Sequence, residues 1–308
     1  MFKYTLDNKR YHTLNYFYQE HFHHKVFKVS LNANFSCPNF KNGSGCIFCL
    51  HGSNDYDTSK NNDLIIQFNE VKDILENKWP NSYYIGYFQA NTNTYAPVSV
   101  LKEKFEKILN LDKVVGLSIA TRSDAITDEC YDYLEELNKK TFLTVELGLQ
   151  SSKEETLKLI KRGHDLQNFI AAVENLKKRN IKVVVHIING LPYETKEDMV
   201  NTVKFLNGLG IDGIKIHMLH ILKGTELEKM YNETHFPILT KEEYIDIVIE
   251  QLEHLNENVV IHRITGDPNV KDLIAPTWLI KKFCVLNDID KEMVRRDVYQ
   301  GDKVNHNH

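Results

Sequence analysis

The chain has 308 residues, with 38 Lys and Arg against 42 Asp and Glu, and 42 % of it is hydrophobic. That size fits either two small domains or one large α/β barrel with an extension. The net charge of -4 excludes a nucleic-acid binder held by bulk positive charge, so such a contact requires a local patch. Five cysteines are too few for a disulfide scaffold. A polar N-terminus, and apolar runs well short of about 18 residues, predict a cytoplasmic protein without a membrane span.

Short apolar runs recur between amphipathic segments at roughly 30-residue intervals, which is typical of βα units around a parallel sheet. Several runs are continuously apolar, which predicts strands buried on both faces. The predicted strands cover residues 26–31, 83–88, 114–120, 141–149, 182–188 and 213–219. Six units are two short of a closed eight-stranded barrel, so we expect an α/β fold with an open, partial (β/α)6 barrel. Its ligand should bind at the carboxyl ends of the strands.

Helical periodicity fills the segments between these strands. Ser152 and Glu155 have the spacing of a capping box and predict a helix start at that point. Cys130 and Cys284 stand in apolar, helical contexts and are predicted to be core thiols. One helical face is predicted to carry Leu166, Phe169, Ile170, Val173 and Leu176.

The chain after residue 240 carries a long predicted helix to residue 255, a strand at 259–263 and a last helix at 281–296. It contains no Pro/Ser-rich linker, so this part should pack on the barrel rather than be tethered to it. We therefore expect an N-terminal extension (1–25), a barrel core (26–239) and a C-terminal α/β extension (240–308).

Three of the five cysteines, Cys37, Cys46 and Cys49, lie within 13 residues directly after the first predicted strand. The loop between them contains proline and glycine, so it can wrap a metal and offer backbone N–H groups to the sulfurs. Structural zinc requires four closed ligands, so three cysteines suggest a metal position left open for an exchangeable ligand. A zinc knuckle completed by His51, or a chance grouping of reduced cysteines, remain alternatives.

The cysteine loop and several further motifs resemble the radical SAM superfamily. Its usual signature separates the first two cysteines by three residues, whereas the spacing here is C-x8-C-x2-C. The longer loop is similar to the branch that contains the Elongator catalytic subunit and a group of short bacterial proteins. Asn34, Phe40 and Ser44 depart from the Gly, Arg and Gly common in that group. The match runs through KVSLNANFSCPNFKNGSGCIFC, GYFQANTNTYAP, VELGLQSS, KRGHD, INGLP, RITGDP and APTWLIKK.

The resemblance implies a TIM-like radical SAM barrel in which Cys37, Cys46 and Cys49 hold a 4Fe-4S cluster. S-adenosylmethionine would chelate the fourth iron. One electron from the cluster would cleave it to a 5'-deoxyadenosyl radical that takes hydrogen from a substrate. An electron donor such as flavodoxin or ferredoxin is the implied partner.

Matching motifs suggest further cofactor-binding residues. Phe48 corresponds to an aromatic position that packs near the adenine, with ordinary loop packing as the alternative. Gln89 stands where the superfamily places a segment that orients the amino group of the methionine. Arg162 follows Gln150 by twelve residues, as does the arginine that binds the cofactor carboxylate in porphyrin-type relatives. Its alternative is a solvated cation at a helix end.

The fourth and fifth strands carry candidates for the ribose hydroxyls. Strand alternation places Glu146 and Gln150 on one face, and Ser151 follows directly. Pointing into the barrel, these polar groups could bind the ribose, whereas burial among the helices would leave them without partners. His186 matches a ribose-binding position, although a satisfied core histidine is an equal alternative.

Candidate substrate residues lie in two places. Tyr87, Asn93 and Tyr95 belong to a polar, aromatic segment that could stack on a flipped-out base, or could form a rigid Asn-rich turn. Lys215 and His217 should face the barrel interior by alternation, whereas His220 and Lys223 could be exposed loop residues. A basic and aromatic set near the C-terminus could follow a phosphate backbone. It comprises Arg263, Trp278, Lys281, Lys282, Arg295 and Arg296.

The resemblance favours a tRNA substrate. The Elongator relative acts on the wobble uridine, and the short bacterial group is similar to enzymes proposed to trim its carboxymethylaminomethyl group to aminomethyl. The expected chemistry is hydrogen removal from the glycine-like methylene, and the acetyl-CoA-dependent Elongator reaction is not expected. A radical SAM enzyme for a metabolite or a protein, and a zinc-bound, non-redox RNA-binding module, are the alternatives.

Overall fold

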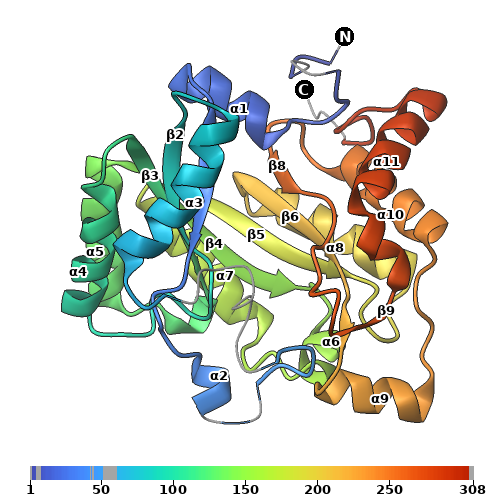
Figure 1. Cartoon of the computed structure of the whole chain (residues 1–308). Helices are drawn as coiled ribbons and strands as arrows, with labels where there is room; N and C mark the ends of the chain where they lie inside the picture. The colour runs from blue at the N-terminus through green and yellow to red at the C-terminus, as the bar shows by residue number, and fades with distance from the viewer. Residues whose placement is uncertain (1, 5–7, 42, 44, 51–60, 305–308) are drawn as a thin grey trace.

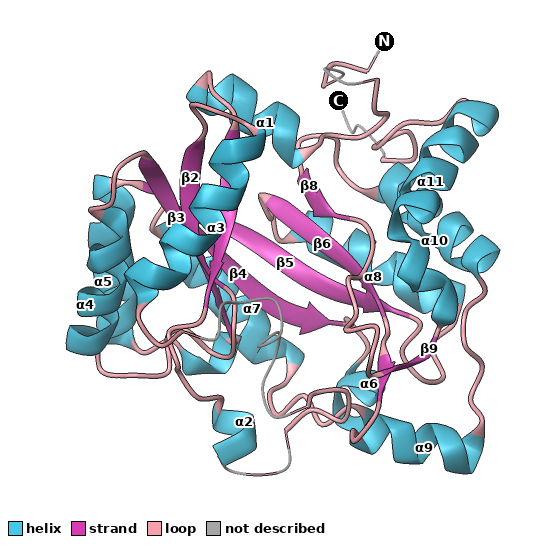
Figure 2. Ribbon diagram, in the orientation of Figure 1, coloured by secondary structure: helices cyan, strands magenta, loops and turns pink. Residues whose placement is uncertain are grey.

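A curled parallel sheet forms the centre of the molecule in the computed structural model, which describes all residues except 1, 5–7, 42, 44, 51–60 and 305–308. Seven strands pair in the order β1-β2-β3-β4-β5-β6-β8. Helices lie along its convex side (Figures 1 and 2), which confirms the predicted α/β, TIM-like partial barrel. The strands are β1 (Val26–Leu31), β2 (Tyr83–Phe88), β3 (Val114–Thr121), β4 (Phe142–Gln150), β5 (Lys182–Asn189), β6 (Gly213–Met218) and β8 (Val260–Arg263).

Strand β8 extends the sheet beyond the six predicted strands. The sequence predicted it as part of the C-terminal extension, but it pairs in parallel with β6. The N-terminal segment also joins at this edge, where Thr13 forms an isolated bridge with Ile261. Gln300, near the C-terminus, connects the N-terminal segment to this edge. Its side chain accepts a hydrogen bond from the His12 amide and donates one to the Val259 carbonyl. The predicted domain boundaries remain predictions.

The helices begin and end at side chains that satisfy their free backbone groups. Capping boxes form at Thr195 before α8 and at Thr240 before α10. The capping box predicted from Ser152 and Glu155 is wrong: α6 starts at Glu154, after a cap without a side-chain hydrogen bond. The helices are α1 (Leu14–Phe22), α2 (Pro38–Lys41), α3 (Leu64–Lys78), α4 (Val98–Leu109), α5 (Asp128–Lys140), α6 (Glu154–Leu159), α7 (Leu166–Lys178), α8 (Lys196–Gly208), α9 (Glu226–Thr234), α10 (Lys241–His254) and α11 (Lys282–Arg296).

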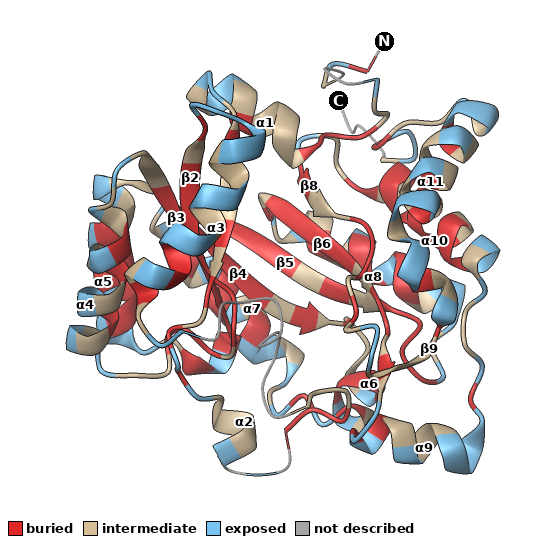
Figure 3. Cartoon of the chain, in the orientation of Figure 1, coloured by how far each residue is buried: buried red, intermediate tan, exposed pale blue. Residues whose placement is uncertain are grey.

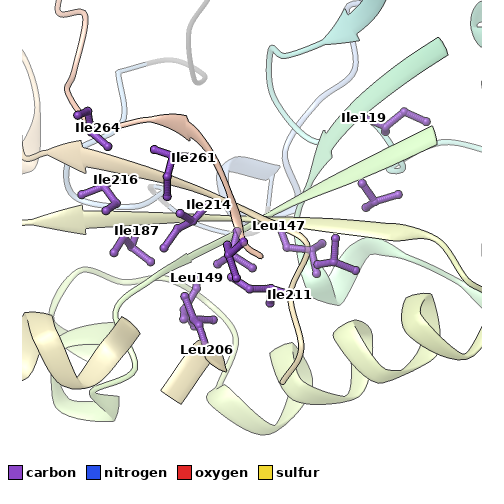
Figure 4. Packing of buried hydrophobic residues seen from close by; sticks show 14 of the residues in the cluster. Ile119, Leu147, Leu149, Ile187, Leu206, Ile211, Ile214, Ile216, Ile261 and Ile264 are labelled. Carbon is purple, nitrogen blue, oxygen red and sulfur yellow. The ribbon is translucent and has the colours of Figure 1, made fainter. Parts of the chain in front are cut away.

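The main hydrophobic core lies between the convex face of the sheet and these helices. Leu147 and Leu149 of β4 and Ile187 of β5 are at most 1 % exposed, and Figure 4 shows them among the packed side chains. The burial pattern in Figure 3 follows the same layers, with red strands inside and blue outer helix faces. Parallel strands covered on both faces require such apolar runs, so the periodicity was a sound predictor here.

The two remaining cysteines differ in burial. Cys130 lies buried in α5, as predicted. The prediction for Cys284 is wrong, because this residue is exposed on α11. That helix buries Val285, Ile289 and Met293 at intervals of four residues, so Cys284 falls outside the packed stripe. Within the described residues, the helices are too short or too polar to cross a membrane.

Candidate active site

One cavity of roughly 470 Å³ opens at the carboxyl ends of the strands. Side chains from every strand between β2 and β6, and from β8, line it together with the cysteine loop. Ligands in barrels of this kind bind where the strands end, because the connecting loops surround that edge. The lining includes Cys37, Phe48, Cys46, Cys49, Tyr87, Gln89, Arg122, Glu146, Gln150, Arg162, His186, Lys215, His217, His220 and Arg263.

The cysteine loop is held at one end of this cavity by backbone hydrogen bonds. Helix α2 starts directly after Cys37, whose carbonyl accepts from the amides of Phe40 and Lys41. The amide of Cys49 donates to the Cys46 carbonyl, which closes a tight turn. Asn39 ties this loop to the loop after α6, because its amide donates to the Cys46 sulfur at 3.4 Å and to the Lys161 carbonyl at 2.8 Å.

The thiols of Cys46 and Cys49 share one hydrogen bond and lie near two arginine side chains. The bond from Cys49, then the nearby Arg162 and Arg122, lower the pKa of Cys46 to about 6 against the opposing effect of burial. The same hydrogen bond, with burial, raises the pKa of Cys49. The surroundings therefore favour a thiolate at Cys46, which is the form that binds a metal.

The three thiols suit a 4Fe-4S cluster better than a single ion. A cluster takes its thiolates on separate irons, and three of them leave one iron for another ligand. In the described part of the chain, no three His, Cys, Asp or Glu side chains converge on a single metal position. His51, the fourth ligand of the zinc alternative, lies outside the described residues, as does Ser44.

Arg162 reaches the cavity from the loop after α6. Its guanidinium donates to the Gly148 carbonyl at 2.6 Å, and burial lowers its pKa. The alternative of a solvated cation is wrong, because the side chain is 4 % exposed. Gln150 lies beside it at a bulge in β4, with a positive φ of 76°. Both side chains border Gly148, where an added Cβ would lie within 3.0 Å of each.

The other predicted cofactor residues divide into two groups. Phe48 and Gln89 line the cavity, and Gln89 also accepts a hydrogen bond from Ser30 at 3.1 Å. Ser151 is buried and donates instead to Glu194, at the side of the barrel. Whether Phe48 and Gln89 contact a bound cofactor remains a prediction.

Glu146 lies at the centre of a buried charged group that we call the Glu146 cluster, formed with Lys28, Ser118, His186 and Lys215. Its first oxygen accepts from Lys28 at 2.5 Å and from Ser118 at 2.6 Å. Its second oxygen accepts from His186 and from Lys215, each at 2.6 Å. These four contacts use both oxygens, so a ribose hydroxyl would have to compete with ion pairs for this carboxylate.

Burial and neighbouring charges determine the ionisation states of the groups in this cluster. Burial opposes ionisation of Glu146, but Lys215, Lys28 and His186 outweigh it and hold the pKa of this carboxyl well below its usual value. Burial lowers the pKa of His186 to about 4, so this histidine is neutral at pH 7. Burial, together with Lys28 and Arg263, lowers the pKa of Lys215 to about 7 despite its carboxylate partner.

Some of the predicted substrate residues line the cavity and others do not. Tyr87, Lys215, His217 and Arg263 line the cavity, and Lys215 donates to the Tyr87 hydroxyl at 2.7 Å. Asn93 is buried outside the lining, where its side-chain amide donates to three backbone carbonyls. This is the rigid turn that the sequence left open as the alternative.

Tyr95, His220 and Lys223 differ in whether they reach the cavity. Tyr95 lies outside the cavity lining, and Lys41 stands over its ring at 5.8 Å. His220 lines the cavity, so the alternative of an exposed loop residue is wrong for it, while Lys223 is exposed.

The predicted basic set near the C-terminus does not form one surface. Trp278 donates to the Leu239 carbonyl and packs against the core. Arg296 pairs with Asp246 at 2.7 Å and Arg295 with Glu292 at 2.6 Å, on helices away from the cavity. Arg263 is the member of this set that lines the cavity among the described residues.

Arg122 is a cavity residue that the sequence reasoning missed. It follows β3 directly and donates to the Arg162 carbonyl at 2.8 Å and to Asp124 at 2.8 Å. Its place after a buried strand was a usable signal, because site residues in such barrels come from strand ends. Lys28 was missed because nothing in a single strand shows that its partner is Glu146, three strands away.

Two family models match the chain. The radical SAM superfamily model matches residues 37–206, and the radical SAM C-terminal domain model matches residues 211–295. The first match begins at Cys37 and includes the cysteine loop, Glu146, Gln150 and Arg162. The second includes Lys215, His217 and Arg263.

Similar proteins and structures agree with these models. The Bacillus subtilis protein YtqA is 48 % identical over 305 residues, covering 97 % of this chain and 94 % of its own length. Escherichia coli YhcC is 31 % identical over 272 residues, covering 87 % of each chain. The solved structure of Methanocaldococcus infernus Elp3 matches in fold with a TM-score of 0.68 and 21 % identity, over 90 % of this chain and 64 % of that one. The chain therefore belongs to the radical SAM superfamily, whose members use S-adenosylmethionine and a 4Fe-4S cluster.

Proposed function

We propose that this enzyme modifies the wobble uridine of tRNA by converting its carboxymethylaminomethyl side chain to aminomethyl. The observation that carries the proposal is the shared cavity, whose lining holds the three cysteines and, in a separate part of the sheet, the cationic side chains of Lys215 and Arg263. A radical generated at the cysteine end would be confined with a substrate held at the other. Such confinement shields a reactive carbon from water.

The relatives support a nucleic-acid substrate without naming this one. The Methanocaldococcus infernus tRNA uridine(34) acetyltransferase is 32 % identical over 139 residues, which is 44 % of this chain and 26 % of that protein. Its name refers to uridine 34, the wobble position of tRNA.

The residues that would hold the cofactors are those at the cysteine end. Cys37, Cys46 and Cys49 would bind the cluster, and Arg162 and Gln150 would face the methionine and ribose parts of S-adenosylmethionine. When bound, these cofactors supply a carbon radical that removes a hydrogen atom from the substrate. The protein's own contribution is to orient the methylene between the amine and carboxylate, to exclude water and to receive an electron donor such as flavodoxin or ferredoxin.

Mass spectrometry of tRNA nucleosides tests the proposal directly. A deletion strain should accumulate 5-carboxymethylaminomethyluridine and lose the aminomethyl derivatives, and a plasmid copy should restore them. A Cys46→Ala copy should fail to restore them, which ties the modification to the cysteine site. An unchanged wobble-uridine profile in the deletion strain would contradict the tRNA assignment. If the reduced protein still released 5'-deoxyadenosine, the radical chemistry would stand and the substrate would be another class.

A further inference from the structure

Around Glu146, the cavity holds more cationic side chains than this one buried carboxylate can pair with. Lys28, Lys215 and Arg263 surround this region, and Glu146 is the carboxylate buried among them in the described structure. The Lys215 side chain is 9 % exposed and that of Glu146 is 0 % exposed, so water screens these charges poorly. Uncompensated charge in such a place is costly unless a ligand of opposite charge completes it.

Three groups on this wall have hydrogen-bonding capacity to spare. Lys215 donates to Tyr87 and to Glu146, which leaves one of the three ammonium hydrogens unused. The Nε2 atom of His217 is buried without a hydrogen-bond partner. Arg263 makes no hydrogen bond or ion pair with any residue that the structure describes, although it has five N–H donors. Lys28, by contrast, is fully engaged by Ser118, Glu146 and His262.

Strand pairing brings the three groups together. Lys215 and Arg263 are register partners on the neighbouring strands β6 and β8, and His217 follows Lys215 by two residues on the same face. All three side chains line the same cavity. We call them the anion wall. The carboxylates nearer the mouth are engaged elsewhere, since Asp267 accepts from Lys282 and Asp272 from Asn269.

We infer that the anion wall, formed by Lys215, His217 and Arg263, is the subsite that binds the carboxylate of the substrate. The inference rests on the proposed function and sharpens it, because it requires a substrate with a carboxylate close to the carbon that loses hydrogen. A guanidinium and an ammonium on adjacent strands suit the two oxygens of such a group. Holding the carboxylate there would fix the neighbouring methylene relative to the cysteine end of the cavity.

A matched pair of nucleosides tests this subsite by binding alone. The probes are 5-carboxymethylaminomethyluridine and 5-aminomethyluridine, which differ by the carboxymethyl group. Titration calorimetry on the anaerobically reconstituted protein with S-adenosylmethionine should show at least about tenfold tighter binding of the carboxylated probe. Equal affinity of the wild-type protein for the two probes would overturn the inference.

Two variants and one control assign the preference to the wall. Arg263→Gln removes a side chain that has no described polar contact, so the fold should survive and the tenfold preference should fall to about threefold or less. Lys215→Met should have the same effect, although it also removes a partner of Glu146. Lys223→Gln removes an exposed cation outside the cavity lining and should leave the preference unchanged. A preference that survives in both Arg263→Gln and Lys215→Met would overturn the inference.

The binding test can contradict the subsite without contradicting the tRNA assignment, and the tRNA test can do the reverse. An unchanged tRNA profile together with a wall-dependent preference for the carboxylated probe would remove the tRNA assignment and support the subsite. A changed tRNA profile without any preference between the probes would support the proposed function and overturn the subsite. Far-ultraviolet circular dichroism of each variant separates lost folding from lost recognition.

Discussion

The two ends of the cavity are built in different ways. At the cysteine end, the three cysteines lie within one short loop, which backbone hydrogen bonds and the side chain of Asn39 hold in place. The Glu146 cluster and the anion wall, by contrast, draw one side chain each from β1, β3, β4, β5 and β8, and two from β6. The first end is a local structure that the sequence reveals, whereas the second exists only after the sheet has curled.

The two parts of the cavity are also expected to have different roles, one in the radical chemistry and the other in substrate recognition. The cysteine end carries the residues that family membership accounts for, and its electrostatics favour a thiolate at Cys46. The opposite end is where a substrate can be distinguished, because buried donors without acceptors discriminate strongly against ligands that leave them unpaired. Substitutions at the two ends should therefore give different kinds of loss.

The largest expected effect is at the cysteine end. Cys46→Ala should abolish the iron–sulfur chromophore and all release of 5'-deoxyadenosine, because a cluster loses one of three protein ligands. Iron analysis and the visible spectrum of anaerobically purified protein measure this. Cys284→Ala is the matched control, since this thiol is exposed on α11 and should leave iron content unchanged. A colourless wild-type protein with stoichiometric zinc would contradict the assignment.

The second prediction concerns the Glu146 cluster. Glu146→Gln should destabilise the fold by about 3–5 kcal/mol, because Lys28 and Lys215 would then be buried without a carboxylate. Urea unfolding of the apoprotein measures the change. The control is Glu135→Gln, which weakens two solvent-accessible pairs, with Lys139 and with Arg179, and should cost less than about 1 kcal/mol. Equal losses for the two variants would mean that the cluster is not electrostatically important.

The third prediction addresses the connection between the cysteine loop and the loop after α6. Gly163 has a φ of +85°, and a Cβ there would lie 2.5 Å from the side-chain oxygen of Asn39. Gly163→Ala should cost about 1–3 kcal/mol of strain and loosen the loop. Faster loss of iron to a chelator, with the secondary structure retained, is the expected result. Gly208→Ala is the control, because nothing lies within 4 Å of a Cβ at that position.

The fourth prediction is the pH dependence of binding at the anion wall. Lys215 has a pKa of about 7 in the free protein, and a bound carboxylate would raise it. Below pH 7 the ammonium is already charged, so affinity should be constant; above pH 7 binding must take up a proton, so affinity should fall. The loss should approach about tenfold per pH unit between pH 7 and the pKa of the bound state. Lys215→Met should make the profile flat.

Neighbouring groups should not produce this profile. Glu146 stays ionised, because its pKa lies well below its usual value. The pKa of His186 is about 4, and burial holds those of His217 and His262 well below the usual histidine value, so these rings stay neutral above pH 6. The other charged or phenolic groups facing Lys215 are Lys28, Tyr87 and Arg263. A profile that persists in Lys215→Met would contradict the assignment to Lys215.

The smallest expected effect is at Asn34, a position where the resemblance to the radical SAM branch leads us to expect glycine. Its φ is +57°, a conformation that glycine and asparagine tolerate. Asn34→Gly should change the free energy of unfolding by less than about 1 kcal/mol, because relief of strain and added freedom of the unfolded chain oppose each other. Asn34→Val should destabilise more, since a β-branched residue is strained there.

Much of the fold followed from local patterns. Apolar runs predicted β1 and β2 with their observed bounds and the other four strands to within one residue at each end. Helix starts were less predictable: the capping spacing at Ser152 is present, but Ser151 accepts from the Lys153 amide and the helix begins later. Cys284 shows the same limit, because apolar neighbours in sequence do not decide which side of a helix faces the core.

The sequence by itself determined the class of chemistry, because three cysteines at a fixed spacing are a local feature that needs no tertiary contact to be recognised. It also determined the rhythm of strands and helices, since burial on both faces of a strand demands an unbroken apolar run. Only the tertiary structure decided what Glu146 and Lys215 do. Their partners lie 118 and 69 positions apart in the chain for the pairs Lys28–Glu146 and Glu146–Lys215, and strand order alone brings them within 2.6 Å.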